Sequence, residues 1–344
     1  MTLRNLLLAA VLAMAAAAPA TAKPLLVGFY LPWDAASQGS LRRHARSLDV
    51  AAPMLASVVS PAGEIRWQDD PAGREVAAKR PRVMPVISNA HDEVWDTLAS
   101  DGVILTAAAR DGFAAQLVTR AKAQGFSGYV IDFENLSPRG EAGLAAFLAA
   151  VRAQLRPQGL ELWVTAGLSA DDALVQRLAA ATDAVVLMAY DQCWATSTPG
   201  PIAGNAWLAA ELEARLRRVD PRRYVVALGA YGYDWPAGQT ATVVSAPGAA
   251  ALAKAQGRRS TRQAPDGNPH FAYVAGGRAH AVWYLDAGTF RAQQADTAAR
   301  GVRGVALWRL GLEDPAIWTP AATVPSSGRP AGTAATCAPL PARR

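Results

Sequence analysis

Cysteine and histidine are scarce in this chain of 344 residues, which contains 2 cysteines and 4 histidines. Cys193 and Cys337 lie far apart, and neither has another cysteine or a histidine nearby at the spacing of a zinc site. We therefore expect neither a disulfide-rich scaffold nor a bound metal, and no motif indicates a cofactor. Stability must come from a hydrophobic core, which a composition of 51% hydrophobic and 18% charged residues can supply.

Blocks of positive charge are also absent. The formal net charge of +6 comes from 34 Lys+Arg against 28 Asp+Glu, and the basic residues are scattered singly or in pairs such as Arg42-Arg43. Nucleic-acid grooves need clustered basic residues, so we expect no nucleic-acid partner. Nothing in the sequence indicates a scaffold for other proteins, and we expect a monomer.

Long apolar runs are missing after the first residues. Residues 1–22 combine Arg4, an apolar run over 6–18 and the small residues Ala20-Thr21-Ala22, which together are typical of a signal peptide. The apolar run is shorter than the roughly 20 residues that span a bilayer. We therefore expect export to the periplasm or the medium, a mature chain that begins at Lys23, and no membrane insertion after processing.

Short apolar runs rich in β-branched residues alternate with alanine-rich stretches along most of the chain. This alternation is typical of repeated β-α units around a parallel sheet. The predicted strands are 25–31, 50–59, 82–88, 128–133, 161–167, 184–190, 224–230 and 304–308. The predicted helices include 107–124, 141–155, 170–181, 206–218 and 289–300, which carry apolar residues at spacings of three and four.

Eight such units predict a (β/α)8 barrel, the TIM barrel of the α/β class, over residues 23–318. An open doubly wound sheet is the alternative, but it usually has a glycine-rich turn after its first strand, and this strand runs into Leu31-Pro32-Trp33-Asp34. Between strands seven and eight, residues of about 236–284 predict a small α+β insertion, with a helix at 246–255 and a hairpin at Gly276-Gly277. Residues 319–344 lack periodicity and predict a disordered tail.

Strand four ends in two carboxylates, Asp132 and Glu134, at a spacing that points both side chains to the same side. The carboxyl ends of barrel strands form the active-site mouth, so both side chains should lie there. Two carboxylates held close repel each other, and one of them should bind its proton tightly enough to act as a general acid near neutral pH.

Aromatic and acidic residues also end other strands: Tyr190-Asp191 end strand six, Tyr231 follows strand seven and Trp308 ends strand eight. Aromatic rings stack on the apolar faces of sugars and carboxylates accept hydrogen bonds from hydroxyl groups, so this mouth suits a carbohydrate. A Gly-x-Ser-x-Gly elbow and a histidine metal motif are both missing, which argues against serine hydrolases and metallohydrolases.

The sequence resembles glycoside hydrolase family 18, the family of chitinases and related N-acetylglucosaminidases, from about residue 25 to residue 318. Residues 128–134 resemble the second half of the family signature Asp-x-x-Asp-x-Asp-x-Glu, residues 188–191 resemble its Met-x-Tyr-Asp, and Trp308 matches its strand-eight tryptophan. Residues 229–235 and 282–286 resemble the spore-cortex branch. Residues 187–203 resemble family-18-like domains fused to bacterial polysaccharide deacetylase and glycosyltransferase modules.

The resemblance implies a retaining, substrate-assisted hydrolysis of a β-linked polymer that contains N-acetylglucosamine. Glu134 would protonate the glycosidic oxygen, Asp132 would orient the 2-acetamido group, and Tyr190 would donate a hydrogen bond to that group. The expected substrate-binding residues are Asp191, Trp308, Tyr30, Trp33, Tyr231, Trp194 and Asn89.

Two positions depart from the family pattern, because Ser127 and Val130 stand where the signature has its first two aspartates. The proton-sharing chain of acids that normally leads to Asp132 is therefore missing. This leaves a second hypothesis open, a barrel that binds such a polymer without cutting it.

The cysteines also leave two possibilities open. The composition of the tail favours two unpaired thiols, whereas an oxidising compartment would permit a Cys193–Cys337 bridge that pins the tail beside the sugar groove.

Overall fold

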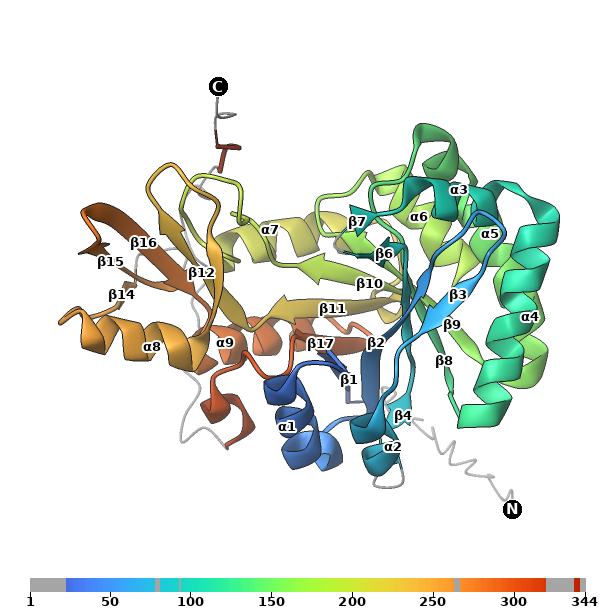
Figure 1. Ribbon diagram of the computed structural model, residues 1–344, viewed down its shortest axis with the longest axis horizontal. Coiled ribbons are helices and arrows are strands. Elements are labelled where there is room, and N and C mark those ends of the chain that lie inside the picture. The colour runs from blue at the N-terminus through green and yellow to red at the C-terminus, as the bar shows by residue number, and fades with distance from the viewer. Residues whose placement is uncertain (1–22, 78–80, 93, 263–266, 320–336, 341–344) are drawn as a thin grey trace, which may run out of the picture.

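Eight parallel strands form a closed barrel in the computed structural model (Figure 1). The structure describes residues 23–77, 81–92, 94–262, 267–319 and 337–340. Each barrel strand pairs with the next, and β1 pairs with both β2 and β17, which closes the ring. The predicted (β/α)8 barrel is confirmed. In order around the ring, its strands are β1 (Leu25–Tyr30), β2 (Val50–Val58), β5 (Val86–Ser88), β8 (Gly128–Asp132), β9 (Glu161–Gly167), β10 (Ala184–Ala189), β11 (Tyr224–Gly229) and β17 (Gly304–Trp308).

Helices cover the outside of the barrel. Each of five helices begins at an Asp or Ser whose side chain accepts a hydrogen bond from the backbone N–H three residues later, which satisfies a donor that the helix leaves free. The helices along the ring are α1 (Ala35–His44), α2 (Pro71–Ala77), α3 (Thr97–Leu105), α4 (Ala107–Gln124), α5 (Pro138–Leu155), α6 (Asp172–Ala181), α7 (Asn205–Leu216) and α9 (Ala287–Ala299), with single 3-10 turns at 45–47, 156–158, 221–223 and 315–318.

Apolar residues fill two layers, because successive strand residues point alternately into the barrel and towards the helices. The inner layer includes Phe29, Met84, Val130 and Trp163, and the outer layer includes Tyr30. Val130, which stands where the family signature has an acid, is therefore part of the packed barrel interior.

The predicted third strand is interrupted. Residues 82–88 form β4 (Arg82–Val83) and β5, with Pro85 between them. Proline has no N–H to donate to a ladder, so the pairing with β2 breaks at this point and resumes at Val86.

A second, antiparallel sheet follows β11 and stands on the opposite side of the barrel from α4 and α5 in Figure 1. It starts at β12, before the predicted boundary of 236, and α8 (Ala246–Ala255) packs on one of its faces. Gly276 and Gly277 connect β15 to β16 with positive φ angles of 55° and 74°, which a two-residue hairpin turn requires. Its strands are β12 (Tyr231–Pro236), β13 (Thr242–Ser245), β14 (Thr261–Arg262), β15 (Pro269–Ala275) and β16 (Arg278–Tyr284).

Three further short strands lie beside the barrel, next to β2 and after β5. β3 (Ile65–Trp67) pairs with residues 56–58 of β2, whereas β1 pairs with residues 50–53 of the same strand. β6 (Ala90–His91) and β7 (Val94–Trp95) form a small hairpin after β5.

A disulfide joins Cys193 to Cys337, with 5.4 Å between the two Cα atoms. The expectation of two free thiols is therefore wrong. Backbone hydrogen bonds from Thr198 N–H to Ala338 O (2.7 Å) and from Leu340 N–H to Thr196 O (2.8 Å) hold the same segment. A Cβ at Gly200 would lie 2.4 Å from Cys193 Sγ, so the loop needs glycine there.

These contacts correct the predicted tail for residues 337–340, which are held against the loop after β10. Residues 320–336 and 341–344 and the predicted signal peptide of residues 1–22 lie outside the described residues. No helix within the described ranges is both long and apolar enough to cross a membrane.

We expect the disulfide to stabilise the fold. A bond between residues 144 positions apart stabilises by up to about 5 kcal/mol in the chain-entropy model, so Cys337→Ser should unfold at a lower temperature than the wild type without reductant. Reductant should lower the wild-type Tm to that of the variant and leave the variant unchanged. Quantitative alkylation of both thiols in unreduced protein would contradict the prediction.

Candidate functional site

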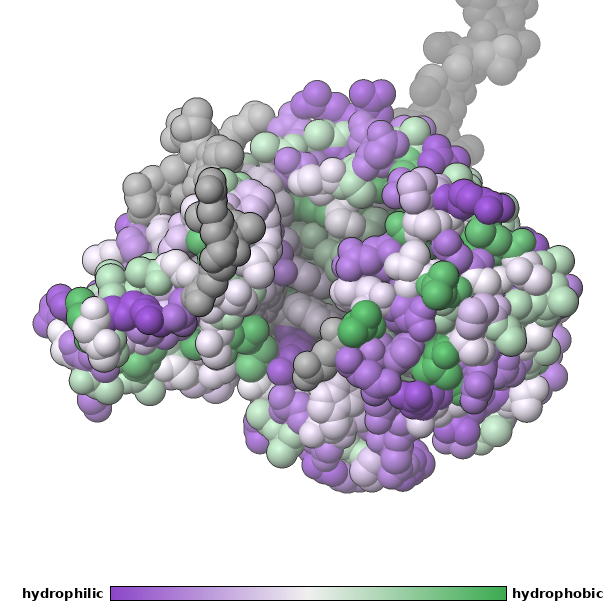
Figure 2. All heavy atoms as spheres, turned by 45° about the horizontal axis from the view of Figure 1, so that its top comes forward, coloured by the Kyte–Doolittle hydropathy of each residue, from purple (hydrophilic) through white to green (hydrophobic). Residues whose placement is uncertain are grey.

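The carboxyl ends of the barrel strands open into a cleft of about 630 Å³. Figure 2 shows this face of the molecule hollowed between its two halves. Some of the residues predicted for catalysis or binding line the cleft, and they come from β1, β8, β10 and β17 or from the loops that follow these strands. Phe29 of β1 also lines the cleft. These predicted residues are Trp33, Asp132, Glu134, Tyr190, Asp191 and Trp308.

Asp132 is the last residue of β8 and is buried in the floor of the cleft. Thr165, on the neighbouring strand β9, donates a hydrogen bond from Oγ1 to Asp132 Oδ1 at 2.6 Å. Burial raises the pKa of the Asp132 carboxyl, and the Thr165 hydroxyl acts in the opposite direction by stabilising the charged form. Val130 packs in the apolar barrel interior, so the hydrogen-bond partner of Asp132 is the Thr165 hydroxyl and not a side chain at position 130.

Glu134 lies two residues beyond Asp132, where the β8 ladder has ended. Its backbone is fixed by the buried side chain of Asn89: Glu134 N–H donates to Asn89 Oδ1 at 2.9 Å, and Asn89 Nδ2 donates to Glu134 O at 2.9 Å. Thr97 Oγ1 donates to the next carbonyl, that of Asn135, at 2.8 Å. These bonds position the Glu134 carboxyl at the cleft.

The charge environment of Glu134 is that of a proton donor. Burial, followed by the negative charges of Asp132 and Asp191, raises its pKa from 4.5 to about 7. At neutral pH the carboxyl therefore exists in both protonation states, which a group that gives and then takes back a proton requires.

Tyr190 and Asp191 follow β10 on another side of the cleft. Asp191 accepts hydrogen bonds from the hydroxyl groups of Tyr231 and Tyr233, the second at 3.1 Å. Burial raises the pKa of the Asp191 carboxyl, and these two hydrogen bonds oppose that shift. For Tyr190, burial and the nearby carboxylates raise the pKa well above its usual value of 10, so its hydroxyl keeps its proton and remains a donor.

Aromatic rings form part of the cleft wall. The rings of Trp308 and Tyr190 stack with their centroids 6.0 Å apart and their planes 15° apart. The rings of Phe29 and Trp308 meet edge to face, with their centroids 5.7 Å apart. Trp33, on the loop after β1, is 59% exposed. Flat apolar surfaces beside hydrogen-bonding groups suit a sugar ring.

Four of the predicted binding residues do not line the cleft. Tyr30 is fully buried in the outer layer, where its hydroxyl donates to Asp70 Oδ2 at 2.5 Å. Asn89 holds the backbone of Glu134, and buried Tyr231 holds Asp191. Trp194 lies on the disulfide-linked loop, where its backbone N–H donates to Ser197 Oγ. Asn89 and Tyr231 therefore support cleft residues in this structure, and Tyr30 faces away from the cleft.

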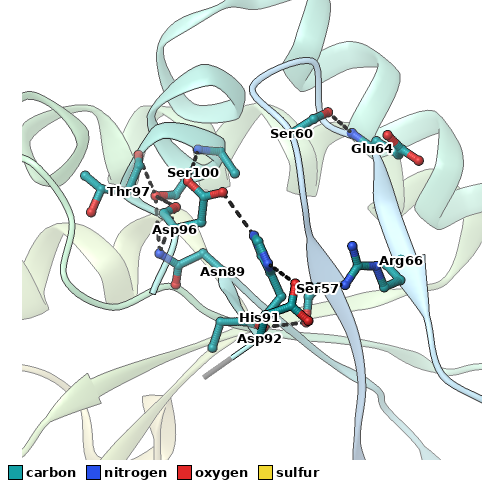
Figure 3. A network of polar contacts seen from close by, with 12 residues as sticks. Ser57, Ser60, Glu64, Arg66, Asn89, His91, Asp92, Asp96, Thr97 and Ser100 are labelled. Carbon is teal, nitrogen blue, oxygen red and sulfur yellow. Dashed lines mark hydrogen bonds and ion pairs between the residues drawn. The ribbon is translucent and has the colours of Figure 1, made fainter. Parts of the chain in front are cut away.

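Sequence reasoning missed the wall built by β2, β3 and the β6–β7 hairpin. It carries polar and charged side chains into the cleft, and Figure 3 shows part of its hydrogen-bond network. No signature accompanies β3 or the hairpin, because strands of two or three residues have no readable periodicity. The residues of this wall that line the cleft include Met54, Ser57, Arg66, Gln68, His91, Asp92 and Trp95.

Strained backbone gathers around the cleft. The non-glycine residues with positive φ within the described ranges are Asp92 (50°), Asn135 (51°) and Asp191 (57°). Two of them line the cleft and the third directly follows Glu134. Such conformations are costly and persist where the surroundings enforce them, often at functional sites.

Among the residues that the structure describes, no group of three or more His, Cys, Asp or Glu side chains could hold a metal ion. The cleft offers a proton donor, a neighbouring buried carboxyl, a tyrosine hydroxyl and an aromatic surface. These groups can carry out acid-catalysed cleavage of a glycosidic bond.

Comparisons with known proteins agree with this geometry. The model of the family described as glycosyl hydrolases family 18 matches residues 59–313. The chain is 28% identical to the uncharacterized glycosylase YvbX of Bacillus subtilis, over 91% of this chain and 95% of that protein. It is 27% identical to the cortical fragment-lytic enzyme of Bacillus subtilis, over 59% of this chain and 51% of that protein.

Solved structures have the same fold. The spore cortex-lytic enzyme SleL of Bacillus megaterium superimposes with a TM-score of 0.79 at 20% identity, covering 88% of this chain and 74% of that one. A chitinase from Chromobacterium violaceum superimposes with a TM-score of 0.79 at 24% identity, covering 88% of this chain and 98% of that one.

We expect the Glu134 carboxyl to titrate with a midpoint near 7, because its pKa is raised to about 7. Asp191→Asn should lower this midpoint, since removing a neighbouring negative charge favours ionisation. Carbon-13 NMR of labelled glutamate carboxyls can follow both midpoints. Asp92→Asn is the control, because Asp92 also lines the cleft but is not among the causes of the Glu134 shift. A midpoint near 4.5 in the wild type would contradict the prediction.

Proposed function

Because this chain belongs to glycosyl hydrolases family 18, we propose that it cleaves a β-linked polysaccharide containing N-acetylglucosamine by a retaining, substrate-assisted mechanism. The observation that carries this proposal is the carboxyl of Glu134, which lines the cleft two residues beyond buried Asp132 and has a pKa of about 7. Chitin-like chains, the glycan of peptidoglycan and exopolysaccharides share the required sugar.

Glu134 is the general acid in this proposal. In its protonated form it donates to the glycosidic oxygen as the bond to the anomeric carbon breaks. It then takes a proton from the water that completes the hydrolysis. A pKa near the working pH serves both half-reactions, because neither protonation state is scarce.

Asp132 and Tyr190 act on the 2-acetamido group of the same sugar. The acetamido oxygen attacks the anomeric carbon, and positive charge develops on the group as the ring closes. Asp132, held by Thr165, orients the acetamido N–H and stabilises that charge, while the Tyr190 hydroxyl donates to the acetamido oxygen. The protein then needs no covalent nucleophile.

Trp308, Asp191 and Trp33 bind the sugar chain in this proposal. Trp308 lies beneath the reacting sugar, with its ring held by stacking on Tyr190 and by the edge of Phe29. Asp191 accepts hydrogen bonds from sugar hydroxyl groups, and exposed Trp33 stacks on a sugar farther from the bond that is cut.

The alternative hypothesis, a barrel that binds glycans without cutting them, rests on the missing acids at Ser127 and Val130. Three observations favour the hydrolase. Glu134 is present and lines the open cleft, and Trp194, on the loop that carries Cys193, does not line it. Thr165 also gives Asp132 a hydrogen-bond partner without those acids.

We further propose that the protein works outside the cytoplasm as a monomer. A disulfide persists in oxidising compartments, which supports export of the chain. The residues proposed for catalysis line one cleft within a single chain, so the proposed site is complete without a second copy.

Replacing the proposed acid should abolish most of the activity. Glu134→Gln keeps the shape of the side chain but removes the proton, so turnover of N-acetylated oligosaccharides should fall by at least about 100-fold while glycan binding stays within a few-fold. Glu141→Gln, an exposed glutamate on α5, is the matched control. Product analysis by mass spectrometry and binding by calorimetry decide the outcome: equal turnover in both variants would remove the assignment.

The acetamido group should be essential for cleavage. An oligomer with a free amine at the cleavage position lacks the attacking oxygen, so fully deacetylated oligomers should resist the enzyme while N-acetylated oligomers of the same length are cut. Proton NMR of the first products should show retention at the anomeric carbon. Rapid cleavage of the deacetylated oligomers, or inversion, would indicate a different mechanism.

A further inference from the structure

The charges that line the cleft are unevenly distributed. Asp132, Glu134 and Asp191 follow β8 and β10, whereas Arg66 lies on β3, in the wall that extends beyond the barrel mouth. Among the described lining residues, Arg66 is the one arginine or lysine. A ligand that reaches from the barrel mouth to β3 therefore meets the carboxyl groups that follow β8 and β10 and then the guanidinium group of Arg66, which has the carboxyl of Asp92 beside it.

Arg66 is loosely held. Its side chain is 54% exposed, and its ion pair with Asp92 has an Nη1–Oδ2 distance of 3.4 Å, with Asp92 75% exposed. An exposed pair with one long contact contributes little to stability. The guanidinium group has five N–H donors, so most of them remain for a ligand in the cleft.

Asp92 keeps its place without Arg66. His91 Nδ1 lies 3.2 Å from Asp92 Oδ2, and His91 Nε2 lies 3.0 Å from Asp96 Oδ2 (Figure 3). Asp96 in turn caps α3 through the N–H of Ala99. The hairpin that carries His91 is therefore anchored to α3, and Arg66 can exchange its contact with Asp92 for a ligand without releasing the wall.

We propose that Arg66 forms a subsite for a carboxylate-bearing sugar, which makes the enzyme select glycans that join an acidic sugar to the N-acetylglucosamine bound at Glu134. A guanidinium group binds a carboxylate through two parallel hydrogen bonds, and the Gln68 side chain lines the same wall. The three carboxyl groups that follow β8 and β10 repel the acidic sugar, whereas at the wall one carboxyl, that of Asp92, is offset by the Arg66 guanidinium, so the glycan binds with its acidic sugar at Arg66. This inference rests on the proposed function and names its substrate class.

Two kinds of sugar carry such a carboxylate: muramic acid, as a lactyl ether, and hexuronic acids, on the ring. The experiment uses peptide-free oligosaccharides of alternating N-acetylglucosamine and N-acetylmuramic acid with free lactyl groups. The same oligosaccharides with the lactyl groups converted to methylamides serve as neutral partners, and an oligosaccharide of alternating N-acetylglucosamine and glucuronic acid tests the second source.

Wild-type kcat/KM should be higher for an acidic oligosaccharide than for its neutral partner. Arg66→Gln should lower kcat/KM for the acidic oligosaccharide by about tenfold through KM, and change it less than twofold for the neutral one, because one charge-assisted contact is lost. Arg66→Lys should restore part of the preference. Arg217→Gln, at an exposed arginine that directly follows α7, is the control.

Binding separates this inference from the proposed function. Calorimetry in the Glu134→Gln background, with and without Arg66→Gln, measures acid selectivity even if no oligosaccharide is cut. Loss of selectivity with Arg66 supports the subsite whatever the activity, and the oligosaccharide that loses affinity identifies the source of the carboxylate. If neither acidic oligosaccharide binds more tightly than neutral oligomers, or if Arg66→Gln weakens acidic and neutral ligands equally, the proposal is overturned.

Discussion

Pairing of β1 with both β2 and β17 closes the sheet, and the cleft depends on this closure. Because the eight barrel strands run in one direction, residues far apart in sequence, such as Asp132, Tyr190 and Trp308, meet at one end of the ring. The same closure packs Trp163 and its neighbours into the interior below them. The packing that stabilises the barrel thus also excludes water from the floor of the cleft, and this desolvation raises the pKa values of Asp132 and Glu134.

Beyond the strand ends, side chains replace the ladder. Glu134 has left β8, so no neighbouring strand fixes its peptide group, and the Asn89 amide bonds to both its N–H and its C=O as a strand would. Asn89 Nδ2 also lies 3.3 Å from Ser100 Oγ on α3, which ties the loop after β8 to that helix. A fully buried amide with several partners is costly to disturb, and the position of the proposed acid is correspondingly well fixed.

The sequence predicted the barrel well because its signals are local. Alternating apolar runs mark each strand, and the abrupt change from Val130-Ile131 to Asp132 and Glu134 marks a strand end at the mouth. The prediction that Tyr30 binds substrate placed this residue near the mouth but did not decide to which side of β1 its side chain points. Because successive side chains alternate along the strand, Phe29 points into the barrel and Tyr30 points towards the helices. The supporting role of Asn89, the wall with Arg66 and the pairing of Cys193 depend on contacts between segments distant in sequence, which no local pattern encodes.

The Cys193–Cys337 bond has a consequence for the biosynthesis of this protein. Cys193 emerges from the ribosome 144 residues before its partner, so at about 5–20 residues per second it remains a thiol for on the order of ten seconds. During that interval the chain offers it no wrong partner, because the sequence contains only 2 cysteines. Oxidative maturation therefore has one possible intramolecular product, and a simple thiol oxidant suffices where proteins with more cysteines need an isomerase to correct their pairings.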